Sequence, residues 1–144
     1  MSSWKQKKLD PLSPIIGSNI GDSLFFLGCF KEAADQFRRL LENYPDFAYA
    51  QTRLGLVLLN LSEYEEAIEH IKLARELSKE YTGSIPDLIL ACAMSGRKAE
   101  AEKLVTELES RASEKYLTMT DLALANAAVG RNDRAIYWLQ QSVA

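Results

Sequence analysis

The stretch that decides the fold is AYAQTRLGLVLLNLSEYEEAIEHIKLARELSKEY, residues 48–81. Its first half, 48–61, is rich in leucine and alanine, and Ser62 then breaks the pattern. Its second half, 63–79, has glutamate and lysine between apolar side chains that share one helix face, namely Tyr64, Ala67, Ile68 and Ile71. We therefore predict two antiparallel helices joined by a tight turn at Ser62.

This pattern recurs every 34 residues, and 144 residues hold four such units with eight left over. One small residue marks each unit: Ala33, Ala67, Ala101 and Ala135. Five residues earlier stand Gly28, Ser62, Gly96 and Gly130. We expect the alanines where two helices cross closely, and the glycines at turns that need a positive φ. The predicted repeats are 14–47, 48–81, 82–115 and 116–144.

The repeat carries the signature of a known family. The first unit has Ile20–Gly21, Leu24, Gly28, Phe30, Ala33, Phe37 and Pro45, and the second has Leu54–Gly55, Leu58, Tyr64, Ala67, Ile71 and Ala74. These residues resemble the tetratricopeptide repeat, W-x2-L-G-x2-Y, A-x3-F and P over 34 residues. The resemblance implies an all-α, right-handed superhelix of antiparallel helix pairs that binds protein partners. In the third unit, Ile89 replaces the small residue of the first helix.

Two shorter stretches are similar to one bacterial group of such repeats. They are residues 9–14, LDPLSP, and the terminal run from Tyr116 to Leu139. This likeness implies the C-terminal sensing or docking region of a multidomain regulator of the winged-helix, nucleotide cyclase or serine/threonine kinase type. A regulatory region of a cyclase and a free-standing adaptor are the alternatives.

Composition bounds the partners. Hydrophobic residues make up 47% and charged residues 26%, as in soluble globular proteins, and the formal net charge is −3. We expect no nucleic-acid partner, no membrane partner and a cytoplasmic location, since there is no basic surplus, long apolar run or signal sequence. The lysines at 5, 7 and 8 are too few to change this expectation.

A catalytic constellation is not evident. The one histidine, His70, has Glu66 four residues before it on the same predicted helix, but no third ligand or orienting partner is suggested. We predict an exposed histidine without function and two structural thiols, Cys29 and Cys92. The expectation is a non-enzyme with no cofactor and no metal.

The tetratricopeptide resemblance implies a concave groove lined by the first helix of each repeat. Its ligand-facing positions include buried-or-facing candidates Ser18, Thr52 and Leu59. The residues predicted to bind a partner are Asn19, Asp22, Phe25, Phe26, Tyr49, Arg53, Leu56, Asn60, Asp87, Leu90, Met94, Asp121 and Leu124. The lysine and asparagine of the family's two-carboxylate clamp are absent. An extended peptide or amphipathic helix with apolar anchors and a basic residue is therefore the predicted ligand.

The two ends of the array carry apolar residues. Residues 1–13 read as the tail of a preceding repeat, with Trp4 to Leu9 in its second helix, or as an N-terminal arm of a small complete protein. The last helix has Ile136, Leu139 and three residues predicted to self-associate, Tyr137, Trp138 and Val143. A solenoid end without a polar cap favours association, most simply as a two-fold homodimer.

Overall fold

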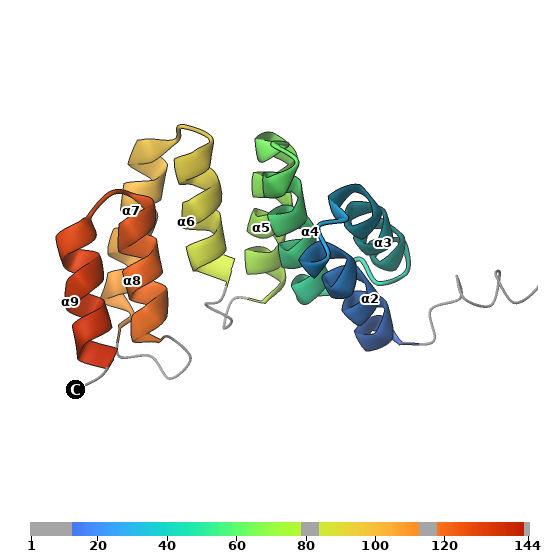
Figure 1. Cartoon of the computed structure of the whole chain (residues 1–144), viewed down its shortest axis with the longest axis horizontal. Coiled ribbons are helices and arrows are strands. Elements are labelled where there is room, and N and C mark those ends of the chain that lie inside the picture. The colour runs from blue at the N-terminus through green and yellow to red at the C-terminus, as the bar shows by residue number, and fades with distance from the viewer. Residues whose placement is uncertain (1–12, 79–83, 113–117, 143–144) are drawn as a thin grey trace, which may run out of the picture.

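The computed structural model describes residues 13–78, 84–112 and 118–142, and these residues form eight helices without strands. Four pairs follow one another along the long axis of the molecule (Figure 1). The first helices, here the A row, are α2 (Pro14–Phe26), α4 (Ala48–Asn60), α6 (Ser84–Met94) and α8 (Met119–Ala128). The second helices, the B row, are α3 (Phe30–Asn43), α5 (Tyr64–Leu77), α7 (Lys98–Ser110) and α9 (Asn132–Ser142).

The predicted all-α repeat superhelix is confirmed, and the four tight turns have the expected geometry. Gly28, Gly96 and Gly130 have φ of 80°, 85° and 81°, and Ser62 takes φ of 63° at the equivalent place. After each of them, one amide bonds back to a carbonyl near the end of the A helix, as Glu63 N does to Leu58 O at 2.9 Å. This is the hydrogen bond that closes a helix ending in a left-handed residue.

Close approach within a pair depends on small side chains. Ala33, Ala67 and Ala101 are fully buried. A Cβ atom added at Gly55 would lie 2.4 Å from Ile71 Cγ1 and 3.1 Å from the Ala67 carbonyl oxygen. Glycine on the A helix and alanine on the B helix therefore let the two backbones pack together.

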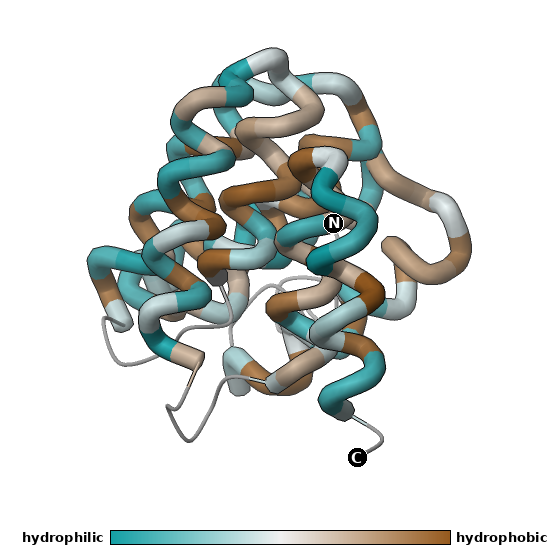
Figure 2. The backbone as a smooth tube through the Cα atoms, turned by 90° about the vertical axis from the view of Figure 1, so that its left-hand side faces the viewer, coloured by the Kyte–Doolittle hydropathy of each residue, from teal (hydrophilic) through white to brown (hydrophobic). Residues whose placement is uncertain are grey.

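The core runs between the two rows. Apolar segments gather inside the stack, and hydrophilic turns lie outside, in the view along the array (Figure 2). Each A helix contacts the B helix before it as well as its own partner, as α4 does with α3 and α5. The large side chains buried along this line are Phe37, Leu54, Leu58, Ile71, Ile85, Leu88, Ile89, Leu108 and Leu122. Ile89, at the position of Gly21 and Gly55, is buried in this core.

Candidate functional site

The thirteen predicted binding residues all lie on the A row. Seven are exposed, namely Asn19, Phe26, Tyr49, Asn60, Leu90, Met94 and Leu124. Six are half-buried, namely Asp22, Phe25, Arg53, Leu56, Asp87 and Asp121. The side chains of Ser18, Thr52 and Leu59 are instead buried, so the wider prediction that these positions face a ligand is wrong. They point into the packed side of their helices.

Arg53 joins α4 to α2. Its Nε donates to Asp22 Oδ1 at 2.7 Å, and the Tyr49 hydroxyl donates to Asp22 Oδ2 at 2.5 Å. The guanidinium also lies over the rings of Phe25 at 5.2 Å and Phe26 at 5.8 Å. The sequence suggested that Asp22 and Arg53 would offer separate charges to a ligand. They neutralise each other instead, and together with the aromatic rings they form an amphipathic patch.

Asp87 has no such partner. Within the described residues, its carboxylate makes no hydrogen bond or ion pair, and burial raises its pKa from 3.8 to about 6. The Arg53 charge acts in the opposite direction, and the nearby Asp121 carboxylate adds to the rise. Asp121 itself bonds the backbone of Thr118 in a capping box at the start of α8. Asp87 is thus the carboxylate with free capacity for a cationic ligand.

Apolar side chains continue the surface around Asp87. Leu90 and Met94 lie three and seven residues further along α6, so they share its helix face. Leu124 stands three residues after Asp121 on α8 and repeats this arrangement 34 residues later. Leu90, Met94 and Leu124 are all exposed. We call Asp87, Leu90, Met94, Asp121 and Leu124 the α6–α8 stripe.

Comparison with known proteins places this geometry in a family. The model of the tetratricopeptide repeat matches residues 19–82. Residues 19–82 belong to the tetratricopeptide repeat family. A crystal structure of MamA is similar to 96% of this chain and 81% of its own, with a TM-score of 0.68 and 21% identity. A crystal structure of MamA protein gives a TM-score of 0.66 over 94% of this chain and 74% of its own, also at 21% identity.

At these identities the likeness concerns the fold, which extends the tetratricopeptide arrangement over nearly the whole chain. No curated protein matches the sequence significantly. Tetratricopeptide repeats are in general non-catalytic interaction modules, and the described residues bring no three His, Cys, Asp or Glu side chains together at a metal site. Within the same residues, none of the helices is both long and apolar enough to cross a bilayer.

His70 is half-buried, so the prediction of an exposed histidine is wrong. Its Nδ1 lies 2.7 Å from Gln51 Oε1, and Gln51 Nε2 donates to the Pro45 carbonyl at 3.1 Å. Because that bond fixes the amide orientation, Gln51 Oε1 accepts and His70 Nδ1 donates. Burial lowers the pKa of His70, against the attraction of Glu66. This histidine anchors the turn between two tetratricopeptide repeats.

Trp138 turns inward. Its Nε1 donates to Glu109 Oε2 at 2.9 Å, and the same oxygen accepts from Asn126 Nδ2 at 3.2 Å and Arg134 Nη2 at 2.7 Å. Burial raises the pKa of Glu109, but these hydrogen bonds outweigh it and hold that pKa below its ordinary value. Trp138 therefore packs on the core, contrary to its predicted place in an open surface. Tyr137 is exposed, and Val143 lies outside the described residues, as do Trp4, Leu9 and the three N-terminal lysines.

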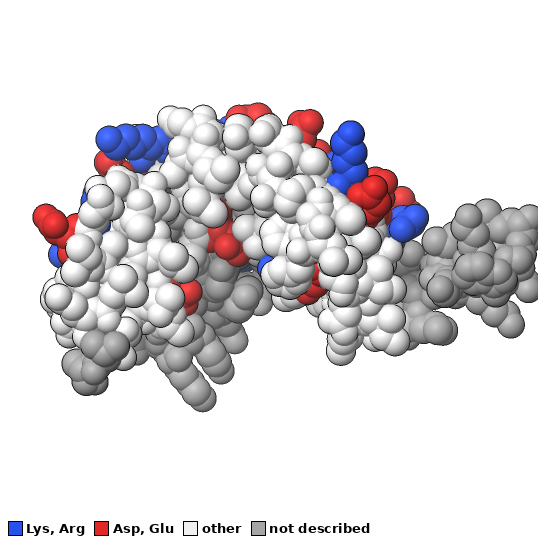
Figure 3. Space-filling model, in the orientation of Figure 1, with Lys and Arg blue, Asp and Glu red and all other residues white. Residues whose placement is uncertain are grey.

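Charged residues of the B row pair between repeats, where pairing within one helix was expected. Arg38 Nη2 lies 2.8 Å from Glu66 Oε1, and Lys72 Nζ lies 3.0 Å from Glu100 Oε1. Each residue of the second pair stands 34 positions after its counterpart in the first. In Figure 3, most charged side chains lie along one edge, and the rest of the visible face is nearly free of charge. The B-row charges thus connect successive repeats and leave the A row for a ligand.

Proposed function

We propose that this chain is a protein-interaction module that binds a peptide or an amphipathic helix along the A row. The ligand has apolar anchors and one basic side chain, and the basic side chain sits against Asp87. The observation that carries the proposal is the unpaired, half-buried Asp87 carboxylate among exposed Leu90, Met94 and Leu124. A cationic partner would offset the unfavourable burial of this charge.

The Arg53 patch supports the orientation of such a ligand. Its charge is satisfied by Asp22, and its aromatic rings present mainly apolar surface with Phe26 exposed. An apolar anchor over Phe26 and a basic residue at Asp87 would span α2 to α6. Asn19, Asn60 and Leu56 lie on the same row and would contact the ligand between or beside these points.

Selection from a displayed library of random peptides tests the proposal. We expect enrichment of peptides that combine apolar residues with lysine or arginine. For a selected peptide, Asp87→Asn should weaken binding by about tenfold or more, as for loss of one partner of a partly desolvated charge pair. Asp35→Asn, on the exposed face of α3, is the matched control and should leave the Kd unchanged.

The pH dependence gives an independent measurement. Because the pKa of Asp87 is about 6, wild-type affinity should fall as the pH is lowered through 6, while the Asn variant shows a flat profile. Enrichment of acidic peptides, or equal affinity of wild type and Asp87→Asn at pH 7.5, would contradict the proposal.

We further propose the docking or sensing region of a bacterial cytoplasmic signalling or transcription protein as the context. The terminal motif supports this context, and no catalytic role is assigned to the chain. The non-catalytic region of an adenylate or guanylate cyclase and a free-standing adaptor or chaperone-like protein remain the alternatives. The complete reading frame distinguishes them: an upstream DNA-binding, kinase or cyclase domain supports the regulator.

A further inference from the structure

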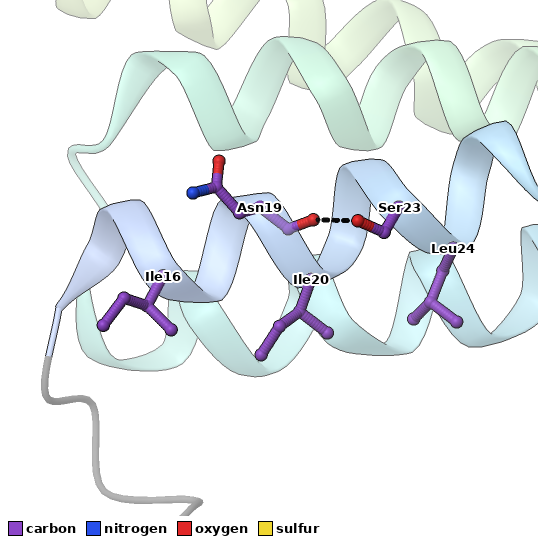
Figure 4. Close-up of a pocket in the computed structure, with 5 residues that line it drawn as sticks. All are labelled: Ile16, Asn19, Ile20, Ser23 and Leu24. Atoms are coloured by element: carbon purple, nitrogen blue, oxygen red, sulfur yellow. Dashed lines mark hydrogen bonds between the residues drawn. The ribbon is translucent and has the colours of Figure 1, made fainter.

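One end of the array carries a row of isoleucine and leucine on α2. Ile16, Ile20 and Leu24 are four residues apart and point the same way, beside Asn19 and Ser23, whose hydroxyl donates to the Asn19 carbonyl at 2.9 Å (Figure 4). They line an open pocket of about 350 Å³. This surface, the α2 face, is separate from the α6–α8 stripe.

The 34-residue register shows what such a face contacts elsewhere in the same molecule. Ile20 is 48% exposed, but its equivalents Leu54, Leu88 and Leu122 are at most 2% exposed. Ile16 and Leu24 correspond to Ala50 and Leu58, which are also buried. In those repeats the B helix of the preceding repeat packs on the A helix, as α3 does on α4 and α5 on α6. The α2 face therefore has the shape and chemistry of a surface that receives a B helix.

The opposite end carries the complementary surface. Leu139 of α9 is 49% exposed, while its equivalents Phe37, Ile71 and Val105 are fully buried. Ile136, also exposed, corresponds to the buried residues Ala34 and Ile68. Those B helices are each covered by the A helix of the following repeat. We call Ile136 and Leu139 the α9 face.

We propose that two copies of this chain associate head to tail, with α9 of one copy packed on α2 of the next. The contact would repeat the interface that the molecule already forms between α3 and α4 and between α5 and α6. Because the two faces differ, the association is heterologous, and each added copy leaves one face of each kind open. The product is an open superhelical chain of copies, in place of the two-fold dimer expected from sequence.

The N-terminal residues of the same chain fit the α2 face less well. In the 34-residue register, Ser3, Gln6 and Lys7 stand where α3 has the apolar residues Phe37, Leu40 and Leu41. A B helix built from them would place polar and charged groups against Ile16 and Ile20, at an unfavourable desolvation cost. The α9 face offers Leu139 and Ile136 at the equivalent positions and is the better occupant.

Analytical ultracentrifugation of the whole chain tests the proposal. We expect the mean mass of the wild type to rise with concentration past that of a dimer, without a plateau. Ile20→Glu and Leu139→Glu should each be monomeric, because each removes one of the two faces required. A 1:1 mixture should form a heterodimer, since Ile20→Glu retains the α9 face and Leu139→Glu retains the α2 face.

Each other outcome overturns head-to-tail packing. Association of Ile20→Glu alone indicates a symmetric contact through α9, and association of Leu139→Glu alone indicates one through α2. Wild type that stays monomeric up to about 1 mM has an interaction free energy weaker than about 4 kcal/mol and contradicts the proposal. Leu73→Glu, at an exposed leucine of α5 outside both faces, is the control and should behave as wild type. Ile16→Glu with Ile136→Glu repeats the design if a first variant fails to fold by circular dichroism.

Discussion

Replacing Asp87 with asparagine should stabilise the protein while it weakens ligand binding. Burial raises the pKa of this carboxyl from 3.8 to about 6, so its charged form is unfavourable in the folded state at neutral pH. The difference corresponds to about 2–3 kcal/mol of unfolding free energy. Asparagine has nearly the same shape without the charge. We therefore expect Asp87→Asn to raise the free energy of unfolding by this amount at pH 7.5.

The pH profile of stability tests the cause of the effect. The folded-state pKa lies above the unfolded value, so the stability that neutral Asp87 provides is fully present below pH 3.8 and is lost as the pH rises through about 6. Urea unfolding at several pH values should give curves for wild type and Asp87→Asn that converge near pH 4 and separate above pH 6. Asp35→Asn should follow the wild type throughout. A difference between wild type and Asp87→Asn that is absent at pH 7.5, or that does not vary with pH, refutes the explanation by burial of charge.

Two backbone positions give further predictions, both measured as free energies of unfolding in urea. Gly55→Ala should destabilise the protein by about 1–3 kcal/mol, because the new Cβ would overlap Ile71 and crowd the Ala67 carbonyl; a more stable variant would show that the helix pair has room to spare. Ser62→Gly should stabilise it by about 0.5 kcal/mol, because Ser62 has φ of 63° and glycine adopts that conformation without a Cβ clash. A lower melting temperature for Ser62→Gly would argue against strain at this turn.

Features set within one repeat were predictable from sequence. The boundary between α4 and α5 at residues 61–63 follows from the break at Ser62, and the positive φ of Gly28, Gly96 and Gly130 follows from their place in the turn. Such features depend on local backbone geometry and on the period, which the amino-acid pattern records directly.

Contacts between repeats were harder to predict. Arg53 reaches Asp22 across 31 residues, and Trp138 reaches Glu109 across 29. Whether two such side chains meet depends on the angle between neighbouring helix pairs, which helical periodicity does not contain. One signal was present: charges that pair between repeats recur with the 34-residue period, as Arg38 with Glu66 does in Lys72 with Glu100.

The α2 face was missed because only the groove register was examined along α2. Placing Ile16, Ile20 and Leu24 beside Ala50, Leu54 and Leu58 identifies them as interface positions from sequence alone. At the other end, the inward turn of Trp138 depends on Glu109, which has no equivalent polar partner in the first two repeats, where Leu41 and Arg75 occupy its position.

The two proposals concern different surfaces of one architecture, and the repeat explains why they are compatible. In a stack of repeats, stability is close to a sum of terms within repeats and between neighbours, so each open end lacks one neighbour term. Head-to-tail packing supplies that term through α2 and α9 and leaves the α6–α8 stripe uncovered. Successive copies would then present Asp87 at regular intervals along one groove. A ligand with basic residues at matching intervals would gain affinity from the increased effective concentration at each further site, even where a single site binds weakly.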